Sequence, residues 1–179
     1  MALLSHMARI GSSDPIELRQ GMADLIEGFD LSRFGSAPTK FDVADLGPLS
    51  AKLLHGMDLA RVESDLLALG VPENITASFW DMARENIETR ADLAGLWALC
   101  RDGVTPVIDD EDTEFVAAAM ALLPAAPRSE TSWKEWTTTV KEATGRKGKG
   151  LFMPLRKALT GMSHGPDMSK LLPLLQKIG

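Results

Sequence analysis

The basic, glycine-rich run Gly145–Gly150 holds residue types that suit an anionic ligand. Its letters are GRKGKG, so Arg146, Lys147 and Lys149 supply positive charge while the glycines leave backbone N–H groups accessible. The run lacks the P-loop spacing and the Ser or Thr that follows the P-loop lysine, which argues against nucleotide binding there. Two interpretations stay open: a loop that contacts phosphates, or a solvated turn that ends the preceding helix.

Residues that commonly perform catalysis are sparse or isolated. The three histidines are far apart in sequence and lack the spacing of metal ligands. The single cysteine, Cys100, cannot form an internal disulfide, and it shares a helical spacing with Leu93, Leu96 and Trp97, so we expect it in the core. There is no tyrosine and no G-x-S-x-G motif. Carboxylate pairs stay open as a catalytic option, but we predict no catalytic residue and no metal site.

An acidic run, Asp109–Asp112, directly precedes an apolar helix predicted over residues 115–123. Negative charge there is favourable because the amino-terminal end of a helix carries partial positive charge. A metal site is the alternative, but the run lacks the glycine and the terminal glutamate of a calcium loop. We therefore assign these carboxylates to the helix dipole.

The charge is distributed unevenly along the chain. The formal net charge is −6, which by itself argues against a nucleic-acid partner. Residues 128–179 hold ten Lys/Arg and four Asp/Glu, a balance of +6, whereas residues 1–127 hold nine and 21, a balance of −12. An anionic partner is therefore expected at the carboxy-terminal third.

Nearly every periodic stretch predicts a helix, because apolar residues recur at intervals of three and four and no period-two run of β-branched residues appears. The sequence predicts an all-α helical bundle of about eight to nine helices in two modules, with a linker at Pro124–Pro127. The expected helices cover residues 15–25, 42–54, 59–69, 72–88, 90–100 and 115–123, then a helix from Ser132, one over LFMPLRKALTG and one at the carboxy terminus.

Two helical patterns in the carboxy-terminal third separate core positions from surface positions. Phe152, Leu155 and Leu159 are spaced to face the core. Trp133 and Trp136 are also spaced for a core face, with stacking on nucleic-acid bases as the alternative.

No apolar run approaches the roughly 20 residues needed to span a bilayer, so we expect no membrane association. The opening segment lacks the charged region and the cleavage site of a signal peptide. A lone thiol is typical of a reducing compartment, and a cytoplasmic protein is expected.

From Gly145 onward the sequence GRKGKGLFMPLRKALTGMSHGPDMSKLLPLL resembles the carboxy-terminal segment of bacterial glutamyl-tRNA synthetases, which carries G-x-K-G-K-x-L-F-x-P-L-R-x-A-L-T-G. LLSHMARIG, LIEGFDLSRFG and FDVADL are similar to the region just after that family's KMSKS loop. The HIGH-type and KMSKS signatures, which activate glutamate with ATP, are absent from the sequence. The resemblance implies a remainder of the stem-contact fold over 1–56, and an anticodon-binding domain with a first module over 57–125 and a basic module over 126–179.

The resemblance also implies site residues. Arg156 is similar to an arginine used at the anticodon loop, and its planar fork suits phosphate oxygens or a base edge; a helix-surface ion pair is the alternative. Gly165, Pro166 and Met168 align with a turn that packs against the first anticodon base, with a simple helix-starting turn as the alternative.

Asn86 aligns near an arginine that helps to read the last anticodon base, and Arg84 lies close to it in sequence. The implied partner is the anticodon stem and loop of glutamate tRNA, bound by a monomer. The implied parent enzyme is a glutamate–tRNA ligase that uses ATP and Mg²⁺, whereas this chain is expected to be inactive alone and to hold no cofactor. The rival hypothesis is a helical protein-interaction domain that no longer contacts RNA.

Overall fold

The computed structural model describes residues 1–178 and contains helices but no strand in that range, with one isolated antiparallel bridge between Ser12 and Phe34. The predicted all-α fold is therefore confirmed, although the described residues form ten α-helices rather than eight to nine. They are α1 (Ala2–Met7), α2 (Met22–Glu27), α3 (Leu46–His55), α4 (Glu63–Ala68), α5 (Thr76–Ala83), α6 (Asp92–Asp102), α7 (Thr113–Ala121), α8 (Ser132–Thr144), α9 (Lys149–Thr160) and α10 (Met168–Leu171). Short 3-10 helices are interspersed at Leu31–Arg33, Val43–Asp45, Leu59–Arg61, Glu73–Ile75, Arg84–Asn86, Asp110–Asp112 and Leu172–Leu174.

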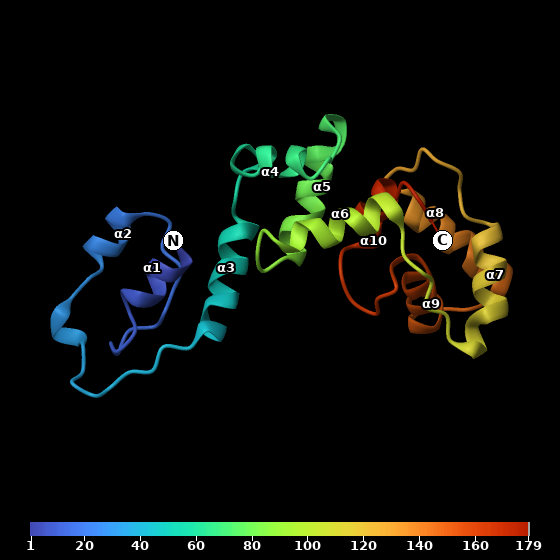
Figure 1. The fold of residues 1–179 in the computed structure, drawn as a ribbon. Coiled ribbons are helices and arrows are strands. Elements are labelled where there is room, and N and C mark those ends of the chain that lie inside the picture. The colour runs from blue at the N-terminus through green and yellow to red at the C-terminus, as the bar shows by residue number, and fades with distance from the viewer. Residues whose placement is uncertain (179) are drawn as a thin grey trace.

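The helices form an elongated molecule (Figure 1). α1 to α3 lie at one end, α4 to α6 lie in the middle with α10 beside them, and α7 to α9 lie at the far end. One continuous hydrophobic core extends from Leu54 to Leu175, whereas the buried Ala2, Leu25 and Leu49 lie outside it. The buried apolar side chains before Leu54 are therefore few and are not part of this core.

The carboxy-terminal residues return to the middle of the molecule. α10 packs against α5 and α8, and Leu171 and Leu172 are fully buried. The backbone N–H of Gln176 donates to the carbonyl oxygen of Cys100 at 2.7 Å. α7 likewise packs on both α8 and α9 across the Pro124–Pro127 linker, so contacts across the linker join the two sides into one core.

The predicted interior position of Cys100 is confirmed. Leu93, Trp97 and Cys100 are 1%, 2% and 0% exposed, and Leu96 packs partly buried against the same core. Burial disfavours the charged thiolate and raises the pKa of Cys100 to about 12.

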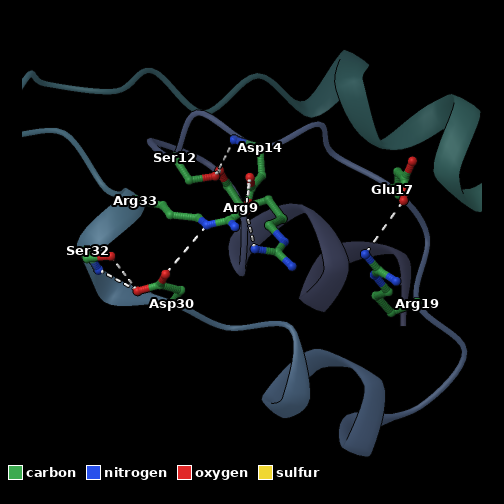
Figure 2. Close-up of polar contacts among 8 residues, drawn as sticks. All are labelled: Arg9, Ser12, Asp14, Glu17, Arg19, Asp30, Ser32 and Arg33. Carbon is green, nitrogen blue, oxygen red and sulfur yellow. Dashed lines mark hydrogen bonds and ion pairs between the residues drawn. The ribbon is translucent and has the colours of Figure 1, made fainter.

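The predicted helix over residues 15–25 is wrong in its first half, because residues 15–19 have no regular structure and α2 begins at Met22. Contacts with residues distant in the sequence hold this segment in a non-helical conformation. The backbone N–H of Arg19 donates to Ser5 Oγ at 2.9 Å, and Asp14 accepts from both Arg9 and Arg33 (Figure 2). These contacts outweigh the modest helix preference of a proline-started segment.

The prediction that Phe152 faces the core is also wrong, since its side chain is 44% exposed. Leu155 and Leu159 are buried as predicted. The buried stripe of α9 begins one residue earlier, at Leu151, and continues through Leu155 and Ala158. Phe152 is therefore rotated by about 100° from that stripe.

Candidate nucleic-acid interface

A cleft at one side of the carboxy-terminal module gathers three of the predicted site residues. It has a volume of about 560 Å³ and is lined by Trp133, Phe152, Arg156, Gly165, Asp167 and Met168. α8 supplies Trp133, α9 supplies Phe152 and Arg156, and the others come from the turn into α10 and its first residue. The sequence motif therefore places Arg156, Gly165 and Met168 around one concave surface.

The Arg156 guanidinium is half-buried and is held by the turn opposite it. Nη1 donates to the carbonyl oxygen of Pro166 at 2.9 Å, and this is its one hydrogen bond within residues 1–178. Burial lowers the pKa of Arg156 from its ordinary value while Asp167 nearby opposes that shift, but an arginine stays charged at neutral pH. No ion pair to Arg156 is found among the described residues, so its remaining N–H donors are available to a ligand.

The turn between α9 and α10 is shaped by glycine and aspartate. Gly161, the residue after α9, has φ of +69°, and Gly165 has φ of +135°, so both positions favour glycine. Asp167 caps α10 by accepting from the Ser169 N–H at 2.8 Å, and this hydrogen bond lowers the pKa of Asp167. The same turn thus starts α10 and lines the cleft, and its contact with an anticodon base stays a prediction.

Two aromatic rings form the wall of the cleft. The centroids of Trp133 and Phe152 are 6.3 Å apart and their planes are tilted by 39°. Trp136 is different, because it is 2% exposed and its Nε1 donates to the Ala119 carbonyl at 2.9 Å. The predicted core position is confirmed for Trp136, whereas Trp133 is only partly buried. Counting the apolar period of α9 from Leu151 would have identified Phe152 as exposed.

The three cationic residues of the basic run differ in their contacts. Arg146 pairs with Asp112 and lies over the Phe115 ring, 4.1 Å from its centroid, so its guanidinium joins this loop to the start of α7. Lys147 and Lys149 are exposed, and neither has an ion pair within the described chain. Phosphate contacts by all three stay predictions, with the two lysines the more accessible.

The acidic run before α7 does more than favour the helix dipole. Asp109 pairs with Lys157 of α9 at 2.6 Å, and Asp112 pairs with Arg146. Two of these carboxylates therefore hold cations of the basic module. Across residues 1–178, no group of three or more His, Cys, Asp or Glu side chains is arranged to hold a metal ion.

Arg84 and Asn86 lie outside the cleft. Arg84 donates to Asp81 at 2.9 Å, and Asn86 Nδ2 donates to the Met82 carbonyl at 2.8 Å. Asn86 lines a second pocket of about 430 Å³, to which Met162 also contributes. The structure does not bring these two residues to Arg156, and their RNA contacts stay predictions.

No helix in the described part of the chain is both long enough and apolar enough to cross a membrane.

Comparison with known proteins gives consistent matches. A family model described as "Anticodon binding domain" matches residues 72–178, which includes the whole cleft. "Glutamate--tRNA ligase 1" of Ruegeria pomeroyi is 66% identical over 178 residues, covering 99% of this chain and 40% of that protein. "Glutamate--tRNA ligase 1" of Roseobacter denitrificans is 66% identical over 177 residues, and "Glutamate--tRNA ligase 2" of Ruegeria sp. is 62% identical over 178, each with the same coverage of 99% and 40%. The chain thus spans about 40% of the length of these curated relatives.

Proposed function

The chain belongs to the anticodon-binding domain family, and from that premise we propose that it binds glutamate tRNA by the anticodon stem and loop, as a non-catalytic part of a glutamate–tRNA ligase. Aminoacylation is assigned to the remainder of such a ligase, where ATP and Mg²⁺ would be used. Residues 1–56 would contact the tRNA stem. We further propose a cytoplasmic monomer that needs no cofactor of its own.

The observation that carries the proposal is the cleft around Arg156. Unpaired RNA bases are read by stacking on aromatic rings and by hydrogen bonds to their edges. The cleft offers both, because Phe152 is exposed and the Arg156 guanidinium keeps free donors. A planar fork of donors also fits a base edge or a phosphate better than a lysine ammonium does.

The charge distribution supports the same face. The positive balance of residues 128–179 includes the exposed Lys147, just before α9, and Lys149, the first residue of α9, which also carries Arg156. Cationic side chains at this end would attract the RNA backbone, and the acidic remainder would discourage binding elsewhere.

Fluorescence anisotropy with labelled RNA tests the proposal. The chain is titrated with glutamate tRNA and with an unrelated tRNA at several salt concentrations. We expect tighter binding of glutamate tRNA and a linear fall of log K with log salt, because bound phosphates release counterions. Absence of salt-dependent binding to either tRNA would refute the proposal and favour the protein-interaction alternative.

A pyrophosphate exchange assay with glutamate and ATP tests the assignment of catalysis. We expect no exchange above the buffer rate by this chain alone. Exchange clearly above that rate would contradict the non-catalytic role.

A further inference from the structure

We propose that Phe152, backed by Trp133, is the stacking platform for one unpaired base of the anticodon loop. This inference rests on the proposed function and deepens it, by assigning a base contact to Phe152 and a supporting role to Trp133.

The exposure of Phe152 is the first step. Phe152 is 44% exposed, whereas the three leucines of the same helix, Leu151, Leu155 and Leu159, are at most 3% exposed. Phe152 lies outside the hydrophobic core, so the fold does not require an aromatic ring there. Because Phe152 lines the cleft, its exposed ring gives a bound ligand a flat apolar face within a concave site.

The geometry of the ring pair decides how a base would bind. A centroid separation of 6.3 Å is within the roughly 4.5–7 Å range of rings in direct contact, so a base cannot insert between Trp133 and Phe152. The base instead stacks on the outer face of Phe152. Trp133 supports the ring from behind, since it packs against the core.

The neighbouring polar groups then meet the edge of that base. Phe152 and Arg156 are four residues apart on α9, so they project from the same face of the helix. Both line the cleft, and the Arg156 guanidinium has N–H donors that Pro166 does not use. Asp167 also lines the cleft, and its Oδ2 accepts no hydrogen bond within the described residues. A donor and an acceptor next to a stacking surface suit a planar heterocycle with mixed edges.

The test compares Phe152→Ala with Leu67→Ala, measured in the whole chain by tRNA anisotropy. Leu67 is a matched control because it is 42% exposed, close to the 44% of Phe152, but lies on α4 and does not line the cleft. Alanine substitution of a base-stacking aromatic is expected to weaken binding of glutamate tRNA by about 5- to 150-fold. Phe152→Trp should restore most of the affinity, and Leu67→Ala should change it by less than about twofold.

The base itself is identified with anticodon stem-loop hairpins that lack one anticodon base at a time. Against one of these abasic RNAs, the wild-type chain and Phe152→Ala should bind equally well, because the stacking partner has been removed. Far-ultraviolet circular dichroism verifies that each variant is as helical as the wild type.

The outcomes separate the two proposals. If the wild-type chain does not bind glutamate tRNA, the proposed function fails. If it binds and Phe152→Ala behaves like Leu67→Ala, only the stacking inference is overturned. A loss from Phe152→Ala that is the same for every abasic hairpin would also overturn it, because the effect would then not depend on any single base.

Discussion

Replacing Arg156 by alanine should affect RNA binding and folding separately, and the structure gives the size of each effect. In the folded chain, Nη1 donates one hydrogen bond to the Pro166 carbonyl from a half-buried position. A hydrogen bond from a charged donor contributes about 1.5–3 kcal/mol at most, and partial exposure reduces this. We expect the free energy of unfolding to fall by roughly 1 kcal/mol.

The loss in RNA binding should be larger. The guanidinium retains donors for a base edge or a phosphate, and a good bidentate base contact contributes about 1–3 kcal/mol of discrimination. Removal of one phosphate contact should also reduce the slope of log K against log salt by about one. Arg156→Ala should therefore bind glutamate tRNA more weakly and discriminate less against an unrelated tRNA.

The control is Arg101→Ala, a change of equal charge on α6, outside the cleft. The Arg101 side chain is 51% exposed and pairs with the adjacent Asp102 at 2.6 Å, so its loss should change stability and affinity little. Arg156→Lys keeps the charge without the planar guanidinium, and it separates a base contact from general attraction. Anisotropy at several salt concentrations gives affinity and slope, and urea denaturation gives stability. Equal, small losses from Arg156→Ala and Arg101→Ala would refute this reasoning.

Three further predictions concern the described side chains. Arg146→Ala should lower the free energy of unfolding, measured in urea, by about 1–3 kcal/mol, because it leaves Asp112 without its cation. Its affinity for tRNA should fall less than that of Arg156→Ala, and a larger fall in affinity than Arg156→Ala would contradict the structural role of Arg146. Cys100 should not react with a thiol reagent between about pH 7 and 9 in the folded chain and should react fully in denaturant, because burial raises its pKa to about 12; fast native labelling would disprove its burial. The Lys170 ion pair lowers the pKa of Asp81 below its ordinary 3.8, so this carboxylate should stabilise the fold at neutral pH and cease to do so as the pH falls through the lowered value. In Lys170→Met, stability should depend less on pH in the acid range than it does in the wild type. The same acid unfolding curve for both proteins would show that the Asp81–Lys170 pair does not stabilise the fold.

Much of the fold follows from local signals. The apolar periods and the glycines after α8 and α9 predict helices whose ends agree with the structure, as with Gly145 and Gly161. The grouping of Arg156, Gly165 and Met168 follows from one short motif, because a helix and the turn after it stay adjacent in any fold. These features depend on neighbours within a few residues.

The incorrect and missing predictions depend on contacts between distant residues. Arg146 forms an ion pair with Asp112, which is 34 residues earlier in the sequence. No local pattern therefore reveals that this arginine is already paired within the protein. The open segment after Asp14 is held by Arg9 and Arg33, and no local helix signal reports those partners. The aromatic wall is similar, because it is built from Trp133 on one helix and Phe152 on the next.

The return of the carboxy-terminal residues to the middle of the molecule bears on how the chain folds during synthesis. Phe79 and Trp97 belong to a core that also needs Leu171, and the chain between Phe79 and Leu171 must be made before that core can close. At about 5–20 residues per second, a ribosome needs roughly 5–20 s for this stretch. During that interval the apolar faces of α5 and α6 lack the carboxy-terminal segment that covers them in the folded protein. We therefore expect the nascent chain to expose hydrophobic surface of the kind that chaperones bind.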